Sequence, residues 1–234
     1  MTNNEIKFIK SLSQKKFREE HGLFVVEGRK LVREAAESGL QIVQHFTEEQ
    51  DGAELMARIS SMSSPSPELA VVRKPARTDL PAAPKGLYLA LDAVRDPGNL
   101  GTIIRIADWF GVSAVLCSDD CAELYNPKVI NASMGSAFRV PVIYGILPEM
   151  LDRFSTAGIP VYGTFLEGED IYRQNLPDDA VLVMGNEANG IGAEVASRCQ
   201  GRLTIPEFGS RAESLNVSVA TAVCVSEFKR WKKA

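Results

Sequence analysis

Residues 87–118 read LYLALDAVRDPGNLGTIIRIADWFGVSAVLCS, and their pattern is the clearest indication of the fold class. The apolar run at 87–94 predicts a buried strand, TIIRIADWFG at 102–111 predicts a helix that ends at a glycine, and SAVLCS at 113–118 predicts a second strand. A loop with two glycines, RDPGNLG at 95–101, connects the first strand to the helix. Because a strand, a helix and a strand form the unit of a parallel sheet, an α/β fold is expected.

The same alternation continues to the C-terminus. Further strands are expected at 138–144, 159–166, 180–185 and 202–206, and helices at 127–133, 147–158, 191–199 and 215–233. Such largely parallel sheets bind ligands outside the carboxyl ends of their strands. The loops after Val94, Leu166, Gly185 and Pro206 are therefore the candidate functional loops.

Residues 1–74 predict a smaller α/β unit that precedes this domain. Its expected elements are a helical stripe over 5–20, strands at 22–28, 41–49 and 69–74, and helices at 29–39 and 53–60. The proline-rich segment 75–86 is predicted to be a linker, which leaves residues 87–234 as the C-terminal domain.

The composition is that of a globular protein, with 45% hydrophobic and 24% charged residues in 234. It excludes a largely disordered chain. The four cysteines form no paired C-x-x-C motif and the two histidines lie far from them, so neither a metal site nor a disulfide framework is expected. No apolar stretch reaches the length of a membrane span, and the first residues do not form a secretory signal, which predicts a cytoplasmic protein.

Charge is distributed unevenly along the chain. Residues 1–33 carry eight Lys or Arg and four Glu, a net charge of +4, so the remaining residues carry −8 within the total of −4. Such a basic arm is typical of a protein that binds nucleic acid, although it can equally be the solvated face of an N-terminal helix.

The candidate loops contain polar residues whose separate interpretations stay open. The spacing of Gly98 and Gly101 is neither the dinucleotide fingerprint nor a Walker loop. Asn99 at the loop apex and Arg105 one turn into the helix can hold a phosphate, or they can be a helix cap and a surface ion pair. Glu187, and likewise Ser214 or Asn216, can simply cap helices.

Three segments taken together favour a functional role for these residues over helix capping alone. DPGNLGTIIRIADWFG at 96–111, LVMGNEANGIG at 182–192 and IPEFGSRAESLNVSVATAV at 205–223 resemble, in order and spacing, the three motifs of the SpoU (TrmH) family of RNA 2′-O-ribose methyltransferases. LSQKKFREEHGLFVVEGRKLVREA at 12–35 resembles the N-terminal RNA substrate-binding domain of family members that act on ribosomal RNA, whose fold is related to a ribosomal protein. The third motif departs from the family, which usually has Met where Glu207 stands before Phe208.

The resemblance implies a fold and a cofactor. The C-terminal domain would be a parallel-sheet α/β trefoil knot of the SPOUT superfamily, and the protein would be a homodimer with its active site near the interface, to which the helix from Leu215 to Trp231 contributes. The methyl donor would be S-adenosylmethionine, with no metal. Its implied binding residues are Thr164, Leu166, Gly185, Asn186, Ile205 and Leu215.

The resemblance also implies an activity, the 2′-O-ribose methylation of RNA, with ribosomal RNA as the expected substrate. Arg105 would clamp the adjacent phosphate and stabilise the developing alkoxide. Asn99 and Asn216 would orient the ribose or the arginine, Ser214 would support them, and Glu187 would organise its loop. The expected RNA contacts are Lys15, Lys16, Arg18, Arg29 and Lys30.

Three alternatives remain open at the level of the sequence. Transfer RNA is a possible substrate, because the motifs do not encode the target. A noncatalytic RNA-binding or ribosome-assembly factor with the same fold would have little reason to retain Asn99, Arg105, Glu187, Ser214 and Asn216 together. A nucleotide-binding α/β protein unrelated to RNA would leave the basic arm unexplained.

Overall fold

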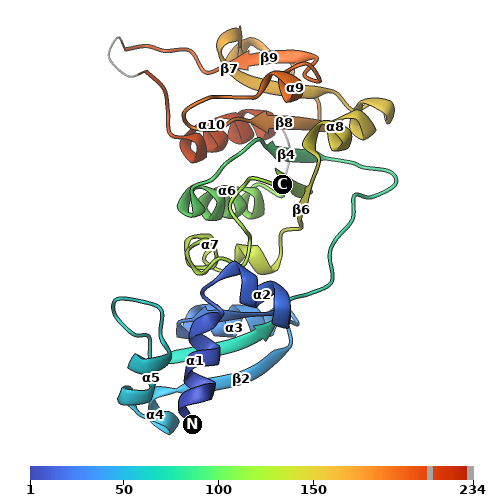
Figure 1. Ribbon diagram of the computed structural model, residues 1–234. Helices are drawn as coiled ribbons and strands as arrows, with labels where there is room; N and C mark the ends of the chain where they lie inside the picture. The colour runs from blue at the N-terminus through green and yellow to red at the C-terminus, as the bar shows by residue number, and fades with distance from the viewer. Residues whose placement is uncertain (210–212, 231–234) are drawn as a thin grey trace.

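The computed structural model describes residues 1–209 and 213–230. Its described part contains two sheets, one before and one after segment 74–86 in the sequence, and Figure 1 shows the smaller unit below the larger one. The predicted boundaries at 74 and 87 stay a prediction, but no helix or strand is found in 74–86, where the backbone is fully described. This segment runs along the larger unit, where Leu80 packs against a core cluster and Arg77 donates to the carbonyl of Tyr144.

The larger sheet of the described chain is parallel throughout, in the order β6-β5-β4-β8-β7-β9, which agrees with the expected α/β fold. Its strands are β4 (Leu87–Leu91), β5 (Ala114–Ser118), β6 (Val142–Gly145), β7 (Val161–Asp170), β8 (Ala180–Met184) and β9 (Gly201–Thr204). Its helices are α6 (Pro97–Trp109), α7 (Pro127–Ser133), η1 (Ser136–Phe138), α8 (Leu147–Thr156), η2 (Ile171–Arg173), α9 (Ala193–Ala196) and α10 (Val217–Lys229). The trefoil knot that the resemblance implies stays a prediction.

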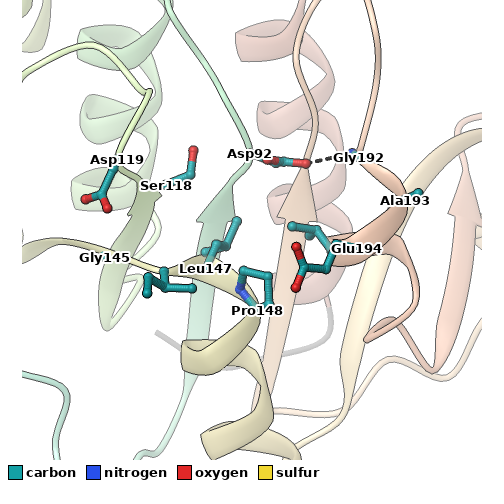
Figure 2. Close-up of a pocket in the computed structure, with 11 residues that line it drawn as sticks. Asp92, Ser118, Asp119, Gly145, Leu147, Pro148, Gly192, Ala193 and Glu194 are labelled. Carbon is teal, nitrogen blue, oxygen red and sulfur yellow. Dashed lines mark hydrogen bonds between the residues drawn. The ribbon is translucent and has the colours of Figure 1, made fainter.

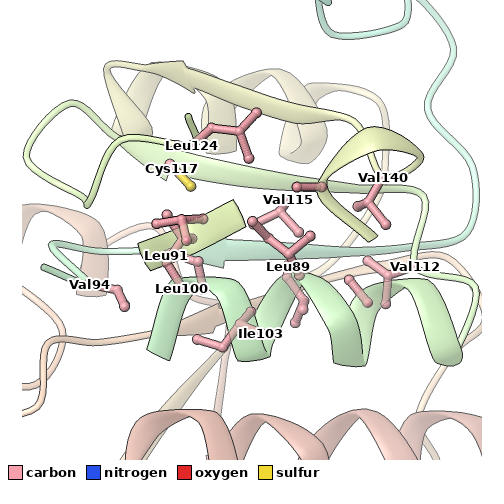
Figure 3. Close-up of a cluster of buried hydrophobic side chains, with 14 of the residues drawn as sticks. Leu89, Leu91, Val94, Leu100, Ile103, Val112, Val115, Cys117, Leu124 and Val140 are labelled. Carbon is pink, nitrogen blue, oxygen red and sulfur yellow. The ribbon is translucent and has the colours of Figure 1, made fainter. Parts of the chain in front are cut away.

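Side chains of the central strands alternate between two apolar layers. Leu89 and Leu91 of β4 face α6 and α10, as seen in Figure 3 for the α6 side, whereas Tyr88 and Ala90 face α8 and α9. Because β4, β5 and β8 are buried on both faces, they read in the sequence as continuous apolar runs. Their positions were therefore predictable from the sequence.

Helix α6 begins earlier than the sequence indicated. The prediction of a loop at 95–101 is wrong. The helix starts at Pro97, and the carboxylate of Asp96 caps it by accepting a hydrogen bond from the amide of Asn99. Gly101 is buried where α6 packs on α7, so it serves helix packing. Arg105 consequently lies about two turns into the helix.

Several other boundaries also differ from expectation. Strand β7 continues to Asp170, with residues 165–168 bulged out of register with β9. Strand β6 and helix α9 are shorter than expected, because η1 occupies the start of the first segment and turns flank the second. The expected helix from Leu215 to Trp231 begins at Val217, and Trp231 lies outside the described residues.

The smaller unit is an antiparallel sheet of the order β1-β3-β2 with helices around it, within residues 1–74, all of which are described. Its elements are α1 (Asn3–Ser11), α2 (Lys15–His21), β1 (Leu23–Glu27), α3 (Arg29–Glu37), β2 (Ile42–Thr47), α4 (Glu48–Asp51), α5 (Ala53–Ile59) and β3 (Glu68–Arg73). The single helical stripe over 5–20 is wrong, because the chain turns after Leu12 and forms two helices.

The two units share one apolar core. Phe24 and Val26 of β1, together with Val32 of α3, belong to the same buried cluster as Leu89 and Ile103 of the larger unit. The other face of the small sheet packs separately on α1 and α5. An apolar interface of this kind opposes relative motion of the two units.

Arg18 is buried at this interface, which corrects its expected role as an RNA contact. Its side chain is 2% exposed, and its Nη1 donates to the carbonyls of Leu12 and Ser13 at the turn between α1 and α2. Its Nε and Nη2 donate to Oε2 of Glu123, at 3.0 and 2.6 Å. Lys74 lies 3.8 Å from the other carboxylate oxygen of Glu123, so two cations of one unit neutralise a carboxylate of the other.

We expect Arg18→Ala to destabilise the protein rather than to weaken RNA binding. The change removes both hydrogen bonds to Oε2 of Glu123 and leaves Lys74 as its remaining cation, so it should lower the free energy of unfolding by about 3 kcal/mol. Denaturant unfolding measures this difference. The control is Lys16→Ala, an exposed neighbour that should change stability by less than about 0.5 kcal/mol. Equal effects of the two substitutions would contradict the buried role of Arg18.

Candidate active site

A chain of hydrogen bonds joins the three sequence motifs at the end of the sheet where the parallel strands have their carboxyl ends. Nδ2 of Asn99, in the first turn of α6, donates to Oε1 of Glu187 at 2.7 Å. Nδ2 of Asn216 donates to Oδ1 of Asn99 at 3.0 Å. Oδ1 of Asn216 in turn accepts from the amides of Ser218 and Val219 at the start of α10. Three loops that are far apart in the sequence therefore meet in one polar network.

The direction of this network is fixed at both ends. Backbone amides can only donate, and an ionised carboxylate can only accept. Each asparagine between them must therefore point its carbonyl toward α10 and its amino group toward Glu187. Asn216 is the N-cap of α10, which confirms one of its two open interpretations, whereas Asp96 rather than Asn99 caps α6.

The loop that carries Glu187 is held by backbone contacts and two polar side chains. A Cβ on Gly185 would lie 2.3 Å from the carbonyl carbon of Gly190, so only glycine allows the loop to fold back on itself. Nδ2 of Asn186 donates to the carbonyl of Ala93 at 2.7 Å, and Oδ2 of Asp92 accepts from the amide of Gly192 at 2.7 Å. The end of β4 thereby anchors the loop after β8.

Two of the predicted catalytic residues lie outside this network. Arg105 is exposed on α6, and among the described residues its side chain makes no hydrogen bond or ion pair. Ser214 is also exposed, with no side-chain bond to the part of the chain that the structure describes. Arg105 is thus free to reach a substrate, and the alternative interpretation, an ion pair with a surface carboxylate, is not formed within residues 1–209 and 213–230.

Five of the six predicted cofactor residues lie within β7 or directly after the adjacent strands β8 and β9, and Leu215 lies just before α10. Leu166 stands in the bulge of β7 with 78% of its side chain exposed, and Leu215 before α10 is 51% exposed. The carbonyl of Leu166 accepts from Thr204, and the hydroxyl of Thr164 donates to the carbonyl of Val183. Uncovered apolar side chains beside the bulge suit an adenine ring, which needs apolar walls and main-chain partners.

Sequence reasoning missed the residues that support this edge. Ala93 has a φ of 55°, a conformation that costs energy for a residue with a Cβ, and Oγ of Ser118 accepts from its amide at 2.9 Å. Asp92 and Ser118 follow or end strands in the sequence, so the rule that ligands bind at carboxyl ends of strands was the available signal. Phe208, beside the unusual Glu207, is 91% exposed.

A cavity of about 310 Å³ lies at the same end of the sheet but contains none of the predicted site residues. Figure 2 shows it between the ends of β5 and β6 and the helices α8 and α9. Asp92, Asp119 and Glu194 contribute carboxylates to its lining. A negatively charged lining does not suit the phosphate groups of a nucleic acid.

The remaining expected RNA contacts are on the surface. Lys15, Lys16, Arg29 and Lys30 are all exposed in the small unit, at α2 and at the start of α3. Within the described residues, no group of His, Cys, Asp and Glu side chains is arranged to hold a metal ion. Among the same residues, no helix has the length and apolar character needed to cross a membrane.

Comparisons with known proteins identify both units. The SpoU rRNA Methylase family model matches residues 86–226, and the MRM3-like substrate binding domain model matches residues 3–81. The chain is 33% identical over 240 residues to the 23S rRNA (guanosine(2553)-2′-O)-methyltransferase RlmP of Bacillus subtilis, covering 95% of each protein. It is 40% identical over 146 residues to the 23S rRNA (guanosine-2′-O-)-methyltransferase RlmB of Neisseria meningitidis, which spans 62% of this chain and 58% of that protein.

A solved structure agrees over the whole chain. The AdoMet-bound rRNA methyltransferase from Sinorhizobium meliloti superposes with a TM-score of 0.90 at 30% sequence identity, covering 100% of this chain and 97% of that one. The family model includes all three motifs joined by the Glu187–Asn99–Asn216 network. The chain therefore belongs to the SpoU rRNA methylase family.

Proposed function

We propose that the protein transfers a methyl group from S-adenosylmethionine to a ribose 2′-hydroxyl of ribosomal RNA, with 23S rRNA as the substrate. The observation that carries this proposal is the network from Glu187 through Asn99 to Asn216, which assembles the three motifs beside the predicted cofactor residues. A relative that matches 95% of this chain is named as a 23S rRNA 2′-O-methyltransferase. A ribosomal RNA substrate supports a cytoplasmic location, which we include in this proposal.

The residues at the ends of β7, β8 and β9 fit the cofactor. Leu166, Leu215 and Ile205 offer apolar surface, and residues 165–168 of β7 are bulged out of register with β9. When bound, S-adenosylmethionine supplies a methyl group that is activated by the positive charge of its sulfonium. The protein must then mainly position the ribose and assist the loss of a proton.

Arg105 is the residue we assign to that proton loss. As the ribose oxygen forms its bond to the methyl carbon, the carbon–sulfur bond breaks and the hydroxyl proton must leave. A guanidinium stays protonated at neutral pH, so Arg105 is a poor general base but a good electrostatic partner. We assign it to clamp the adjacent phosphate, which accepts the proton, and to stabilise the developing negative charge.

The asparagines and Glu187 position the groups around that reaction. Because Asn99 and Asn216 are held in one orientation by their network, they can present fixed polar groups to the ribose without reorganisation. Glu187 terminates the network and thereby organises its loop, and Ser214 lies on the segment that leads into Asn216. The 2′-hydroxyl is also the group that selects RNA over DNA.

We also propose a homodimer. Trp109 on α6 is 84% exposed, and Val219 at the start of α10 is 50% exposed. Helices α6 and α10 pack against each other, so these apolar side chains belong to one layer of the molecule. The opposite side of α10 is buried in the core through Val217. The exposed side of α10 is therefore available to contact a second copy of the chain.

Methyl transfer from labelled S-adenosylmethionine to unmodified 23S rRNA tests the activity. We expect Arg105→Ala to lower turnover by about 100-fold, because it removes a charge that acts on the transition state, and to leave cofactor affinity unchanged. Unmodified transfer RNA is the parallel substrate, and a nuclease digest identifies the 2′-O-methylated nucleotide. Nearly full turnover of Arg105→Ala would contradict its role, and label in transfer RNA alone would contradict the substrate. Absence of cofactor binding would favour the noncatalytic RNA-binding factor.

The exposed cations of the small unit are expected to grip the RNA backbone. Replacing Lys16 and Lys30 by Gln should reduce the slope of log affinity against log salt concentration by about 1.5, since each phosphate contact contributes 0.7–0.9. Filter binding to 23S rRNA fragments at several salt concentrations measures the slope. The control replaces the exposed Lys85 and Arg173 by Gln, which removes the same charge elsewhere. Equal slopes for the two variants would contradict this RNA-binding surface.

For the homodimer, light scattering after size exclusion should give twice the chain mass. Val219→Glu buries an unpaired carboxylate and should raise the dissociation constant by at least about tenfold, which corresponds to about 1.4 kcal/mol. Thr156→Glu, exposed on α8 across the sheet, is the control and should have no effect. A monomeric wild type, or equal masses for both variants, would contradict the proposed face.

A further inference from the structure

One arginine connects the two units at a second point, separate from Arg18. Arg139 follows η1, and its Nη1 donates to Oε2 of Glu34 on α3 of the small unit. Its Nη2 and Nε donate to Oδ2 of Asp108 on α6, at 2.8 and 3.2 Å. The same carboxylate oxygen accepts from Oγ of Ser136 at 2.8 Å. The Arg139 guanidinium therefore bridges a helix of each unit.

The bridge lies close to residues with proposed roles on both helices. Lys30, a proposed RNA contact, precedes Glu34 by four residues on α3, and Arg105 precedes Asp108 by three residues on α6. Each separation is about one helical turn, or about 4.5–6 Å along the helix axis. A short and rigid path thus runs from the RNA-binding surface through Arg139 to the proposed catalytic arginine.

The surroundings of the bridge support a fixed geometry. Gly135 is buried with a φ of 96°, and a Cβ there would lie 3.1 Å from Cβ and Cγ of Glu34. Glycine therefore allows α3 to approach α7 and η1 closely. Asp108, and then Glu34, raise the pKa of the Arg139 guanidinium by hydrogen bonding to it. At 42% exposure the ion pairs alone contribute little stability, so geometry rather than stability is what this bridge provides.

We propose that Arg139 is a positioning residue for methyl transfer, which holds the small unit against α6 so that RNA gripped by Lys30 is aligned with Arg105. The inference rests on the proposed function, because it assigns a role within that reaction. It adds a residue that touches neither RNA nor cofactor and acts through Glu34 and Asp108.

The test compares Arg139→Gln with Arg198→Gln. Arg198 is the matched control, because it also lies between two carboxylates. Its partners, Asp152 on α8 and Glu194 on α9, both belong to the larger unit. For Arg139→Gln we expect turnover at saturating 23S rRNA to fall at least about fivefold, since misalignment acts on the chemical step. Affinities for RNA and for S-adenosylmethionine should stay within about twofold, because the groups proposed to bind them are intact.

A second variant and a second readout separate position from charge and from activity. Gly135→Ala leaves Arg139 intact but displaces Glu34, and it should reproduce the loss of turnover. Trypsin cleavage after Arg77 and Lys85 in segment 74–86 should become at least about threefold faster in both variants and not in Arg198→Gln, because the linker detaches locally more often when the two units are less restrained.

Each outcome has one meaning. Unchanged turnover and unchanged linker cleavage in Arg139→Gln would overturn the proposal. Equal losses of turnover and of cofactor affinity in Arg139→Gln and Arg198→Gln would also overturn it, because they would show a structural role alone. Double substitution of Glu34 and Arg139 by Gln should be no worse than Arg139→Gln, and additive losses would also overturn it. A wild type without methyl transfer would contradict the proposed function, in which case unchanged linker cleavage would separately overturn the bridge.

Discussion

The hydrogen-bond network from Glu187 through Asn99 to Asn216 holds together the loops that form the candidate active site. It is made of groups with only one possible direction of donation, since helix amides end it on one side and a carboxylate on the other. Loss of any member would leave a donor or acceptor without its partner. The three motifs are thus required together because each completes the hydrogen bonds of the next.

The parallel sheet was predictable because its strands are buried on both faces. β4, β5 and β8 appear in the sequence as apolar runs, and α7 begins and ends where Pro127 and Ser133 indicated. The start of α6 was not predictable from local composition, since two glycines close to a proline are typical of a turn. The capping carboxylate of Asp96 and packing on α7 outweigh that preference, and the loop became a helix.

Long-range contacts limited the prediction of the site. Asn99 and Asn216 are 117 residues apart, and no periodicity relates them, so only the family resemblance assigned them to one site, and their direct contact was not predicted. Arg18 shows the opposite case. Next to two lysines it reads as part of a basic surface, yet Glu123, 105 residues away, neutralises it in the interior. Charge in a sequence does not tell which cation faces solvent and which one joins two units.

The joined core has a consequence for how the substrate is selected. Phe24 of the small unit packs within 4.6 Å of Tyr125 of the larger unit, between ring centroids, and the ionic contacts of Arg18 and Arg139 flank this apolar interface. The cations that we assign to RNA binding are therefore held at a set position relative to Arg105 before RNA arrives. A preorganised pair of sites avoids the entropic cost of ordering the units during binding, and it measures distance on the RNA. An RNA that offers phosphates to one unit but no ribose at the required position gains affinity without turnover, so the rigid spacing between the units contributes to selection of the methylated nucleotide.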